Sequence, residues 1–541
     1  MMKKALLSAL CLVLALAVQA QEWTAPAVPA EDLGTLKSTD IVYVYNVKAD
    51  AFAMYGMASN REVCAARLTN GDYTASVPQQ SYVFVQNDQL RIRNKEHGGE
   101  AYFACTADKA NSVVMNGTEG AYFTYAETKE DSHVYTLTNV KYGKALDVSW
   151  TNGGHLTLAN GAGNTEWAFI KETNVTNGAY ALYKSRKLMY AMYEALAAAG
   201  KTETYEAALD EALEAYAADD ATVESITKAS RELFNSVCAD IVEPLDVSFM
   251  LENADMVGNA NAEHWNVGSP SFGWEEFEIY HKSFTMEQEA TLPLGSYDLG
   301  LRSLYREDGS GTAPTLTVTT GKGTYTGKTP LMNNINFGVA NATDNNWIDK
   351  NGKIIPNGMR SCGQALAHGD AVAWVRNIAV DAEGSVLIKY AVTSNEQWVN
   401  WQGFSLYYKG LSRDELVASL SSVIKEATTL YAAGSGNGAA DLKAAIEAAT
   451  AKHDNAETAN SELKASAEAL LLAMKNYRYA NASVQNPIDM TDLIVNPSFE
   501  KKTEGWNIEG MVSQGNDVFK RKEGTTYMER WTGKGGKVGS A

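Results

Sequence analysis

The stretch VYVYNVKADAFAM, residues 42–54, recurs in altered form as LRIRNKEHGGEAYFAC (90–105) and YTLTNVKYGKALDV (135–148). Each version has an alternating strand, a polar turn and a second apolar strand. All three contain an asparagine, Asn46, Asn94 and Asn139, at spacings of 48 and 45 residues. Three all-β units of this length predict a β-trefoil over residues 39–172, because each unit can bury its apolar face only beside the other two.

The composition describes a folded protein of several domains. The chain has 541 residues, of which 45% are hydrophobic and 10% aromatic, values typical of globular rather than disordered chains. Its formal net charge is −19. This charge argues against a nucleic-acid partner, because binding to the phosphate backbone requires a basic face.

The first twenty residues have the pattern of a secretory signal peptide. Lys3 and Lys4 form the basic start, residues 5–18 are apolar, and the small residue Ala20 marks the expected cleavage position. Residues 21–38 are interpreted as a linker. No later apolar run reaches the roughly 18 residues of a membrane-spanning helix, so we expect an exported protein that is secreted or held at the cell surface.

The five cysteines predict neither a zinc site nor a dense disulfide framework. Cys11 lies inside the signal peptide, and Leu10 before it is too large for a lipoprotein signal. The other four are widely spaced: Cys64, Cys105, Cys238 and Cys362. A Cys64–Cys105 disulfide and isolated buried thiols are both compatible with this spacing, and we favour the thiols.

Two segments have apolar residues at helical spacing and predict helical bundles at 176–243 and 411–484. In the second, the sequence SRDE at 412–415 is typical of a capping box. An apolar stripe follows it and consists of Leu416, Leu420, Val423, Ala427 and Leu430. We interpret both stripes as core packing.

Between these bundles, residues 244–410 contain short alternating strands separated by Gly and Asn turns, which predicts a β-sandwich or jelly roll. The start of this segment is repeated in the tail at 485–541, where Asn496 matches Asn253 and Trp506 matches Trp265. The tail is therefore predicted to be a partial second jelly roll. We expect the sequence to be a fragment with further domains downstream; the alternative is a short tail that pairs with another domain.

The fold class predicted is thus multi-domain and mainly β with α modules. The stretch GKALDVSWTNGGHLTLANGAGNTEWAF, from residue 143 to 169, combines Leu-Asp-Val, a Gly-rich turn, Asn-Gly and a final Trp. It resembles the repeat of ricin-type β-trefoil lectins. The resemblance implies that Asp147 and Asn160 bind sugar and that Trp167 is structural. Thr165 departs from the family's Gln, and Thr157 from its frequent stacking aromatic.

Residues 244–410 resemble the galactose-binding-like jelly roll of secreted bacterial glycan-utilisation proteins, through LPLGSYDLGLRSLYR, KIIPNGMRSCGQALAHGD and WQGFSLYYKG. Gly403 stands where that family usually has an acidic residue before the closing Phe404. The helical segments resemble the short three-helix spacers of such proteins.

A sugar site requires an aromatic face beside polar side chains that bind vicinal hydroxyls. In the jelly roll, Trp347 lies in a polar loop and is the first candidate. Tyr305 and Arg306, expected just after a strand, are candidates to face the same site. Trp374 and Trp265, in alternating strands, are interpreted as core.

Catalytic patterns are missing from the sequence. It has no His-Glu-x-x-His motif and no Gly-x-Ser-x-Gly motif, and GKGTYTGKT at 321–329 lacks the first Gly of a phosphate loop. A pair of glycosidase carboxylates is not excluded by counting, but no segment remains for a catalytic domain. We expect no cofactor; calcium is compatible with a jelly roll, but no acidic run specifies a site.

The sequence therefore predicts the non-catalytic carbohydrate-binding portion of an exported bacterial glycan-utilisation protein. Its partners would be polysaccharide or glycoconjugate glycans, held by tethered weak sites. One alternative is the accessory region of a glycoside hydrolase whose catalytic domain lies downstream. Another is a structural, adhesin-type scaffold with decayed sugar sites.

Overall fold

The computed structural model divides into two compact units, residues 1–412 and 413–541. The structure describes residues 22–55, 63–66, 79–95, 102–106, 113–115, 120–149, 155–159, 163–254, 265, 271–273, 276–307, 312–334, 347–348, 354–355, 357–358, 362–363, 365–366, 369, 371–393, 395–432, 436–483, 487, 518–520 and 527–529. The signal peptide predicted at residues 1–20 and most of the predicted partial jelly roll at 485–541 lie outside this part.

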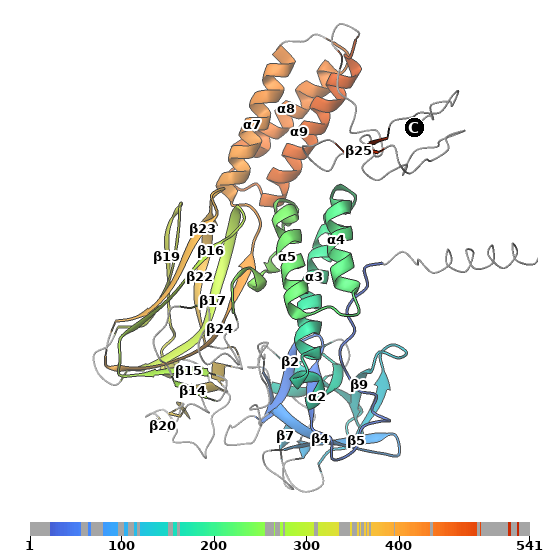
Figure 1. Cartoon of the computed structure of the whole chain (residues 1–541), viewed down its shortest axis with the longest axis vertical. Helices are drawn as coiled ribbons and strands as arrows, with labels where there is room; N and C mark the ends of the chain where they lie inside the picture. Colours follow the sequence, from blue (N-terminus) through green and yellow to red (C-terminus); the bar gives the residue numbers. More distant parts are fainter. Residues whose placement is uncertain are drawn as a thin grey trace, which may run out of the picture. The chain divides into compact units, whose positions relative to one another are not determined.

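Among its described residues, the first unit begins with twelve strands: β1 (Val42–Asn46), β2 (Ala51–Tyr55), β3 (Val63–Ala66), β4 (Gln80–Gln86), β5 (Gln89–Asn94), β6 (Phe103–Cys105), β7 (Val113–Met115), β8 (Phe123–Glu127), β9 (Val134–Asn139), β10 (Lys144–Ser149), β11 (His155–Ala159) and β12 (Glu166–Lys171). Six of them form a closed antiparallel ring in the order β1, β4, β5, β8, β9 and β12, with β12 pairing back to β1. The other six form three hairpins, β2–β3, β6–β7 and β10–β11. A six-stranded barrel with three hairpins, four strands to a unit, confirms a trefoil-like fold. Figure 1 shows the strands of this part in blue to teal.

The repeated asparagines end the first strand of each unit, and all three are buried. In the first unit, Asn46 accepts a hydrogen bond from the Ala49 N–H at 2.9 Å and donates to the Asn164 carbonyl at 2.6 Å. In the third, Asn139 accepts from the Tyr142 N–H at 3.1 Å. A buried Asn side chain thus satisfies the backbone of the turn that follows, which explains why it recurs.

Four helices follow the barrel: α2 (Glu172–Thr176), α3 (Ala179–Ala198), α4 (Glu206–Ala217) and α5 (Val223–Val237). Thr222 caps α5 by accepting a hydrogen bond from the Ser225 N–H at 3.1 Å. At the barrel end, Tyr180 and Tyr183 of α3 pack against Tyr45 and Phe52. The helices are therefore joined to the trefoil by an aromatic cluster.

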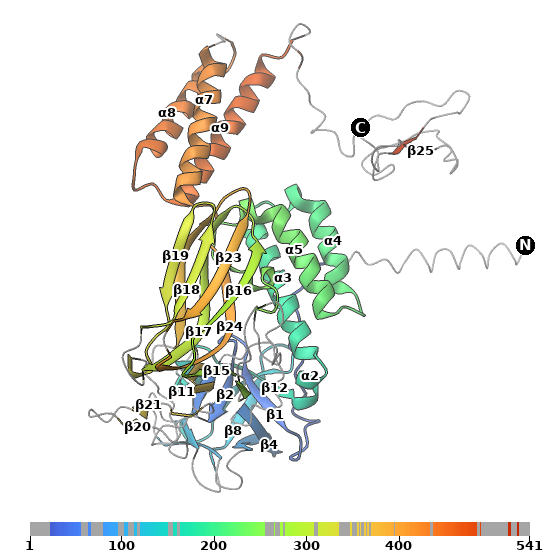
Figure 2. The ribbon, with the colours of Figure 1, turned by 60° about the vertical axis from the view of Figure 1, so that its left-hand side comes forward.

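The twelve strands that follow are β13 (Leu245–Asp246), β14 (Ser271–Gly273), β15 (Glu276–Tyr280), β16 (Phe284–Thr291), β17 (Gly295–Glu307), β18 (Thr315–Thr320), β19 (Gly323–Lys328), β20 (Trp347–Ile348), β21 (Ile354–Ile355), β22 (Val372–Val380), β23 (Ser385–Val392) and β24 (Gln397–Tyr408). Two antiparallel sheets face each other across an apolar core: β14-β15-β24-β17-β22, with β13 beside β24, and β16-β23-β18-β19 (Figure 2). We call the first the long sheet.

The sandwich core continues into the helices. Phe234 of α5 meets the Tyr408 ring of β24 at 5.2 Å between centroids, and one buried cluster runs from Met189 on α3 to Tyr408. The sequence predicts a separate helical spacer at 176–243. In the structure, residues of α3–α5 and of the sandwich belong to one buried cluster.

The second unit contains the three-helix bundle α7 (Arg413–Ala432), α8 (Ala439–Asp454) and α9 (Asn460–Ala480), and the short strands β25 (Val518–Lys520) and β26 (Tyr527–Glu529), which pair with each other. The predicted stripe is buried at Leu416, Leu420 and Ala427. Among the described residues, no helix has the length and apolar character needed to cross a membrane.

Candidate functional site

The third trefoil hairpin holds the first predicted sugar residue. Asp147 lies in β10 directly opposite Thr157 of β11. Below the hairpin, the buried indole of Trp167 donates a hydrogen bond to the Leu146 carbonyl at 2.8 Å. Trp167 therefore has the structural position that the resemblance implies, and it fixes the strand that carries Asp147.

The Asp147 carboxylate lies beneath the loop that precedes β12. It accepts a hydrogen bond from the Val148 N–H at 2.8 Å. A Cβ atom at Gly163 would lie 2.5 Å from Asp147 Oδ2, so a larger residue there would require the carboxylate to shift. The predicted partner Asn160 lies outside the described residues. Asp147 thus faces a loop that begins just after Asn160 in the sequence.

Tyr305 and Arg306 do not share a face, contrary to the sequence-based expectation. Both lie within β17, where consecutive side chains point to opposite sides. Tyr305 is buried in the sandwich core. Arg306 lies on the other side of the long sheet, where its guanidinium is 4.7 Å from the centre of the Trp398 ring and donates a hydrogen bond to Asn357.

Trp347 is in β20, which pairs with β21; the position of its side chain lies outside what the structure describes. Trp265 stacks on Phe404 in the core, with centroids 4.2 Å apart. Trp374 differs from the expectation of a core residue. It is half-buried on the outer side of β22, where its ring covers Gly300 and lies 4.1 Å from the Arg376 guanidinium.

Arg376 is held by a buried carboxylate. Asp298 lies 2.9 Å from Arg376 Nη1 and accepts a hydrogen bond from the Asn377 N–H at 2.8 Å. Burial opposes ionisation of Asp298, but these partners and Lys409 lower its pKa. Asn377 has a φ of 54° and lies where the β17–β22 register shifts. The interactions of Asp298 with Arg376 and Asn377 therefore stabilise the sheet at the register shift between β17 and β22.

A second polar group lies on the outer side of the long sheet, around Asn400 of β24. Its cross-strand neighbours are Glu278 of β15 and Leu304 of β17. Trp398, two residues earlier in β24, donates from Nε1 to Glu278 Oε2 at 2.8 Å. Asn400 is one of several polar residues in an apolar strand, so sequence patterning alone did not single it out.

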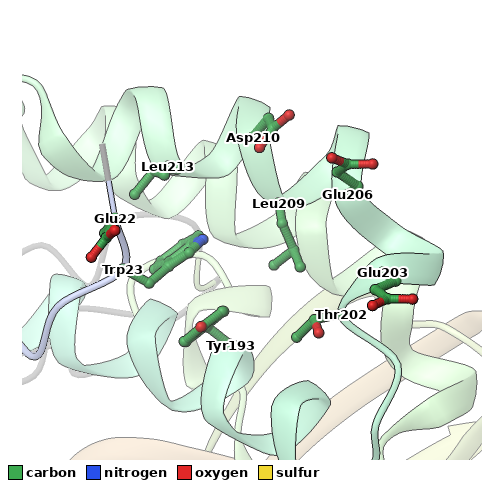
Figure 3. A pocket seen from close by; sticks show the side chains of 9 residues that line it. All are labelled: Glu22, Trp23, Tyr193, Thr202, Glu203, Glu206, Leu209, Asp210 and Leu213. Atoms are coloured by element: carbon green, nitrogen blue, oxygen red, sulfur yellow. The ribbon is translucent and has the colours of Figure 1, made fainter. Parts of the chain in front are cut away.

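An open cavity of about 670 Å³ lies among residues 22–23, α3 and α4. Figure 3 shows the Trp23 ring between Tyr193 and Leu213, pointing toward Leu209. Four carboxylates line the rest: Glu22, Glu203, Glu206 and Asp210. The Trp23 indole occupies the apolar part of the cavity, and the four carboxylates give the remaining part a strongly negative lining.

The described residues include no group of three or more His, Cys, Asp or Glu side chains that could hold a metal ion. Cys105 and Cys238 are free thiols, so the Cys64–Cys105 disulfide is not formed. Burial raises the pKa of the Cys105 thiol to about 12, which leaves it protonated and weakly reactive.

No protein-family model and no curated protein matches this sequence. Solved structures with similarity to parts of it include the Macrolepiota procera ricin B-like lectin in complex with lactose, at 14% identity over 25% of this chain and 98% of that one, with a TM-score of 0.21. TmCBM61 in complex with beta-1,4-galactotriose is 16% identical over 29% of this chain and 97% of its own, with a TM-score of 0.19. BEL beta-trefoil is 11% identical over 28% and 99%, with a TM-score of 0.21. The trefoil assignment here rests on the strand pairings described above.

Proposed function

We propose that this protein binds carbohydrate without cleaving it, and that the third trefoil hairpin is the primary site. The observation that carries the proposal is the position of Asp147. Its carboxylate lies on a hairpin anchored by Trp167 and beneath a loop whose Gly163 leaves room for it. A fixed carboxylate in such a place accepts hydrogen bonds from vicinal sugar hydroxyls.

The wider setting is part of the same proposal. An export signal at residues 1–20 places the protein outside the cytoplasm, secreted or on the cell surface, in a bacterial glycan-utilisation system. The sandwich of residues 244–410 is a galactose-binding-like jelly roll, and the tail begins a second one. Sites on separate modules gain avidity for a polymer through their tether.

The test is a glycan microarray probed with the chain from residue 21 onward, followed by calorimetric titration of the best ligand. Asp147→Ala removes a hydrogen-bond acceptor that is charged, which is worth about 1.5–3 kcal/mol, so affinity should fall about tenfold or more. Glu130→Gln removes one exposed charge from the same trefoil and serves as the matched control.

Three outcomes would contradict the proposal. Equal binding by the Asp147→Ala and parent proteins would remove the hairpin as a site. Absence of binding to every glycan would favour a scaffold with decayed sites, consistent with Thr157 in the place of an aromatic. Release of reducing sugar from a bound polysaccharide would favour the hydrolase alternative.

A further inference from the structure

The β4–β5 hairpin of the trefoil has two chemically different sides. Side chains along a strand alternate between the two sides of a sheet. Val83, Leu90 and Ile92 are buried in the barrel core. The residues that alternate with them in the paired strands lie on the outer side of the barrel: Tyr82, Phe84, Arg91 and Arg93. Two aromatic rings and two guanidinium groups therefore share one outward surface.

Two further tyrosines extend this surface across β5. Arg91 Cζ lies 5.1 Å from the ring centres of both Tyr102 and Tyr122. Arg93 Cζ lies 5.0 and 5.1 Å from the centres of the two β4 rings and 5.8 Å from that of Tyr102. Rings and guanidinium groups thus alternate over the surface. We call it the hairpin patch, and it consists of Tyr82, Phe84, Arg91, Arg93, Tyr102 and Tyr122.

The arginines of the hairpin patch keep donors for a further partner. A guanidinium that lies over a ring contacts it with its face, and its N–H groups point outward within its own plane. Within the described part of the chain, Arg93 forms no ion pair with a carboxylate, and its Nε has no hydrogen-bond partner. The rings also restrict the side-chain rotamers, so less conformational entropy is lost when a ligand binds.

The hairpin patch is open to solvent at its β8 end. Tyr122 is 45% exposed, and Tyr82, Phe84 and Arg91 are half-buried. An exposed phenol ring stacks on an apolar surface, and a guanidinium beside it binds a carboxylate through two parallel hydrogen bonds. A pyranose that bears a carboxylate presents both features, an apolar C–H face and a planar anion.

The charge of the whole chain narrows the class of ligand. Two guanidinium groups favour an anion, but the formal net charge of −19 repels a densely charged polymer. Nucleic-acid binding depends on many phosphate contacts, and two arginines supply few. A saccharide with one carboxylate per ring and neutral hydroxyls elsewhere fits the hairpin patch better.

We propose that the hairpin patch is a second saccharide site, specific for uronates, in which Arg91 and Arg93 bind the carboxylate and Tyr122 stacks on the sugar ring. The inference shares carbohydrate as its ligand class with the proposed function. It uses a different surface of the trefoil, and it differs in requiring a negative charge on the ligand.

The experiment is calorimetric titration of the chain from residue 21 onward with pentagalacturonate and with its methyl ester, which has no charge. The acid should bind, and the ester should bind about tenfold more weakly or worse, because charged hydrogen bonds are lost. Raising the salt concentration should weaken binding of the acid. A single-stranded oligothymidine, titrated in the same way, should bind more weakly than pentagalacturonate.

Arg91→Gln combined with Arg93→Gln should lower the affinity for pentagalacturonate at least about tenfold. The matched control, Lys129→Gln combined with Lys228→Gln, removes two positive charges from exposed positions elsewhere and should leave the affinity unchanged. Tyr122→Ala guards against misfolding, because the residue is exposed. It should lower the affinity severalfold while the unfolding temperature stays the same.

Asp147→Ala separates this inference from the proposed function, and it should leave pentagalacturonate binding unchanged. Loss of this binding in Asp147→Ala, with unchanged affinity in the double arginine variant, would overturn the inference and leave the third hairpin as the site. Equal affinity for the acid and the ester would also overturn it, as would absence of binding to pentagalacturonate or tighter binding to oligothymidine. The third hairpin would still be tested by its own neutral ligand.

Discussion

The indole ring of Trp23 stacks on the phenol ring of Tyr193, with centroids 5.0 Å apart and planes 9° from parallel. Tyr216 of α4 lies at the same centroid distance from Trp23 and donates a hydrogen bond from its hydroxyl to the Thr24 carbonyl at 2.6 Å. Ten residues later, Leu33 is buried in the trefoil core. The residues expected to be a linker therefore bind both the helices and the barrel.

Replacing Trp23 should loosen this attachment. We expect Trp23→Ala to lower the free energy of unfolding by about 2 kcal/mol, below the value for a fully buried Trp because the ring is half-buried. Trp23→Phe keeps a stacking ring and should lose less than half as much. Urea unfolding followed by circular dichroism measures both. Equal stability of Trp23→Ala and the parent would show that the attachment contributes nothing.

A second contact between the barrel and α3 predicts that the stability of the protein depends on pH. Asp50 accepts a hydrogen bond from Tyr45 at 2.6 Å and forms ion pairs with Lys184 and Lys187 of α3. Burial opposes its ionisation, yet the two lysines lower its pKa from 3.8 to about 2. Because the pKa is lower in the folded state, the stabilisation is present above about pH 4 and is lost as the pH falls toward 2.

The variant Asp50→Asn tests this. Asparagine tolerates the φ of 50° at this position. The carboxylate is about one-third exposed and therefore screened, so we expect a loss of about 1 kcal/mol at pH 7. The difference in free energy of unfolding between the two proteins should shrink between pH 4 and 2 in denaturant titrations. A difference that stays constant over this range would contradict the assignment.

Substitutions of the turn residue Asn46 should lower the stability of the trefoil by different amounts. Asn46→Ala removes both a donor and an acceptor in a buried site, leaving the Ala49 N–H and the Asn164 carbonyl unpaired, and should cost about 2–3 kcal/mol. Asn46→Asp keeps the acceptor and should lose less. Thermal unfolding ranks the variants, and an Asp variant as unstable as the Ala variant would show that the donor to Asn164 dominates.

The close approach of Gly163 and Asp147 predicts that substitutions at the two positions have coupled effects on glycan affinity. Gly163→Ala places a Cβ at 2.5 Å from Asp147 Oδ2, so the carboxylate must move and glycan affinity should fall severalfold. In the double variant with Asp147→Ala, the methyl group has nothing left to displace. The two effects should therefore be non-additive in a double-mutant cycle. Additive effects would mean that Gly163 acts independently of Asp147.

The elements that depend on local periodicity were predictable from the sequence. The similar spacing of Asn46, Asn94 and Asn139, 48 and 45 residues apart, predicted three trefoil units. Asn46 and Asn139 each satisfy the turn in their own unit. The stripe of Leu416, Leu420 and Ala427 predicted a helix face in the same way. Trp167 beneath the third hairpin also followed from its local motif.

Alternation along a strand indicates two faces but not which of them is covered. Both sides of the long sheet carry buried residues, so Tyr305 and Arg306 both looked suitable for one site, and Trp374 looked like core. The surroundings of Tyr305, Arg306 and Trp374 in the fold distinguish them, and these surroundings come from distant segments of the chain. Tyr305 belongs to the buried cluster of the sandwich, Arg306 lies against the Trp398 ring, and Trp374 covers Gly300.

What the sequence by itself determined is the set of local units: three β repeats, two helical segments and a run of alternating strands, each specified by neighbours a few residues apart. The tertiary structure decided that α3–α5 share a core with the sandwich, that Trp23 docks between helices, and that Asn400 is buried without partners. These features depend on burial, and burial results from contacts with residues far away in the chain. A local sequence pattern contains no information about those contacts.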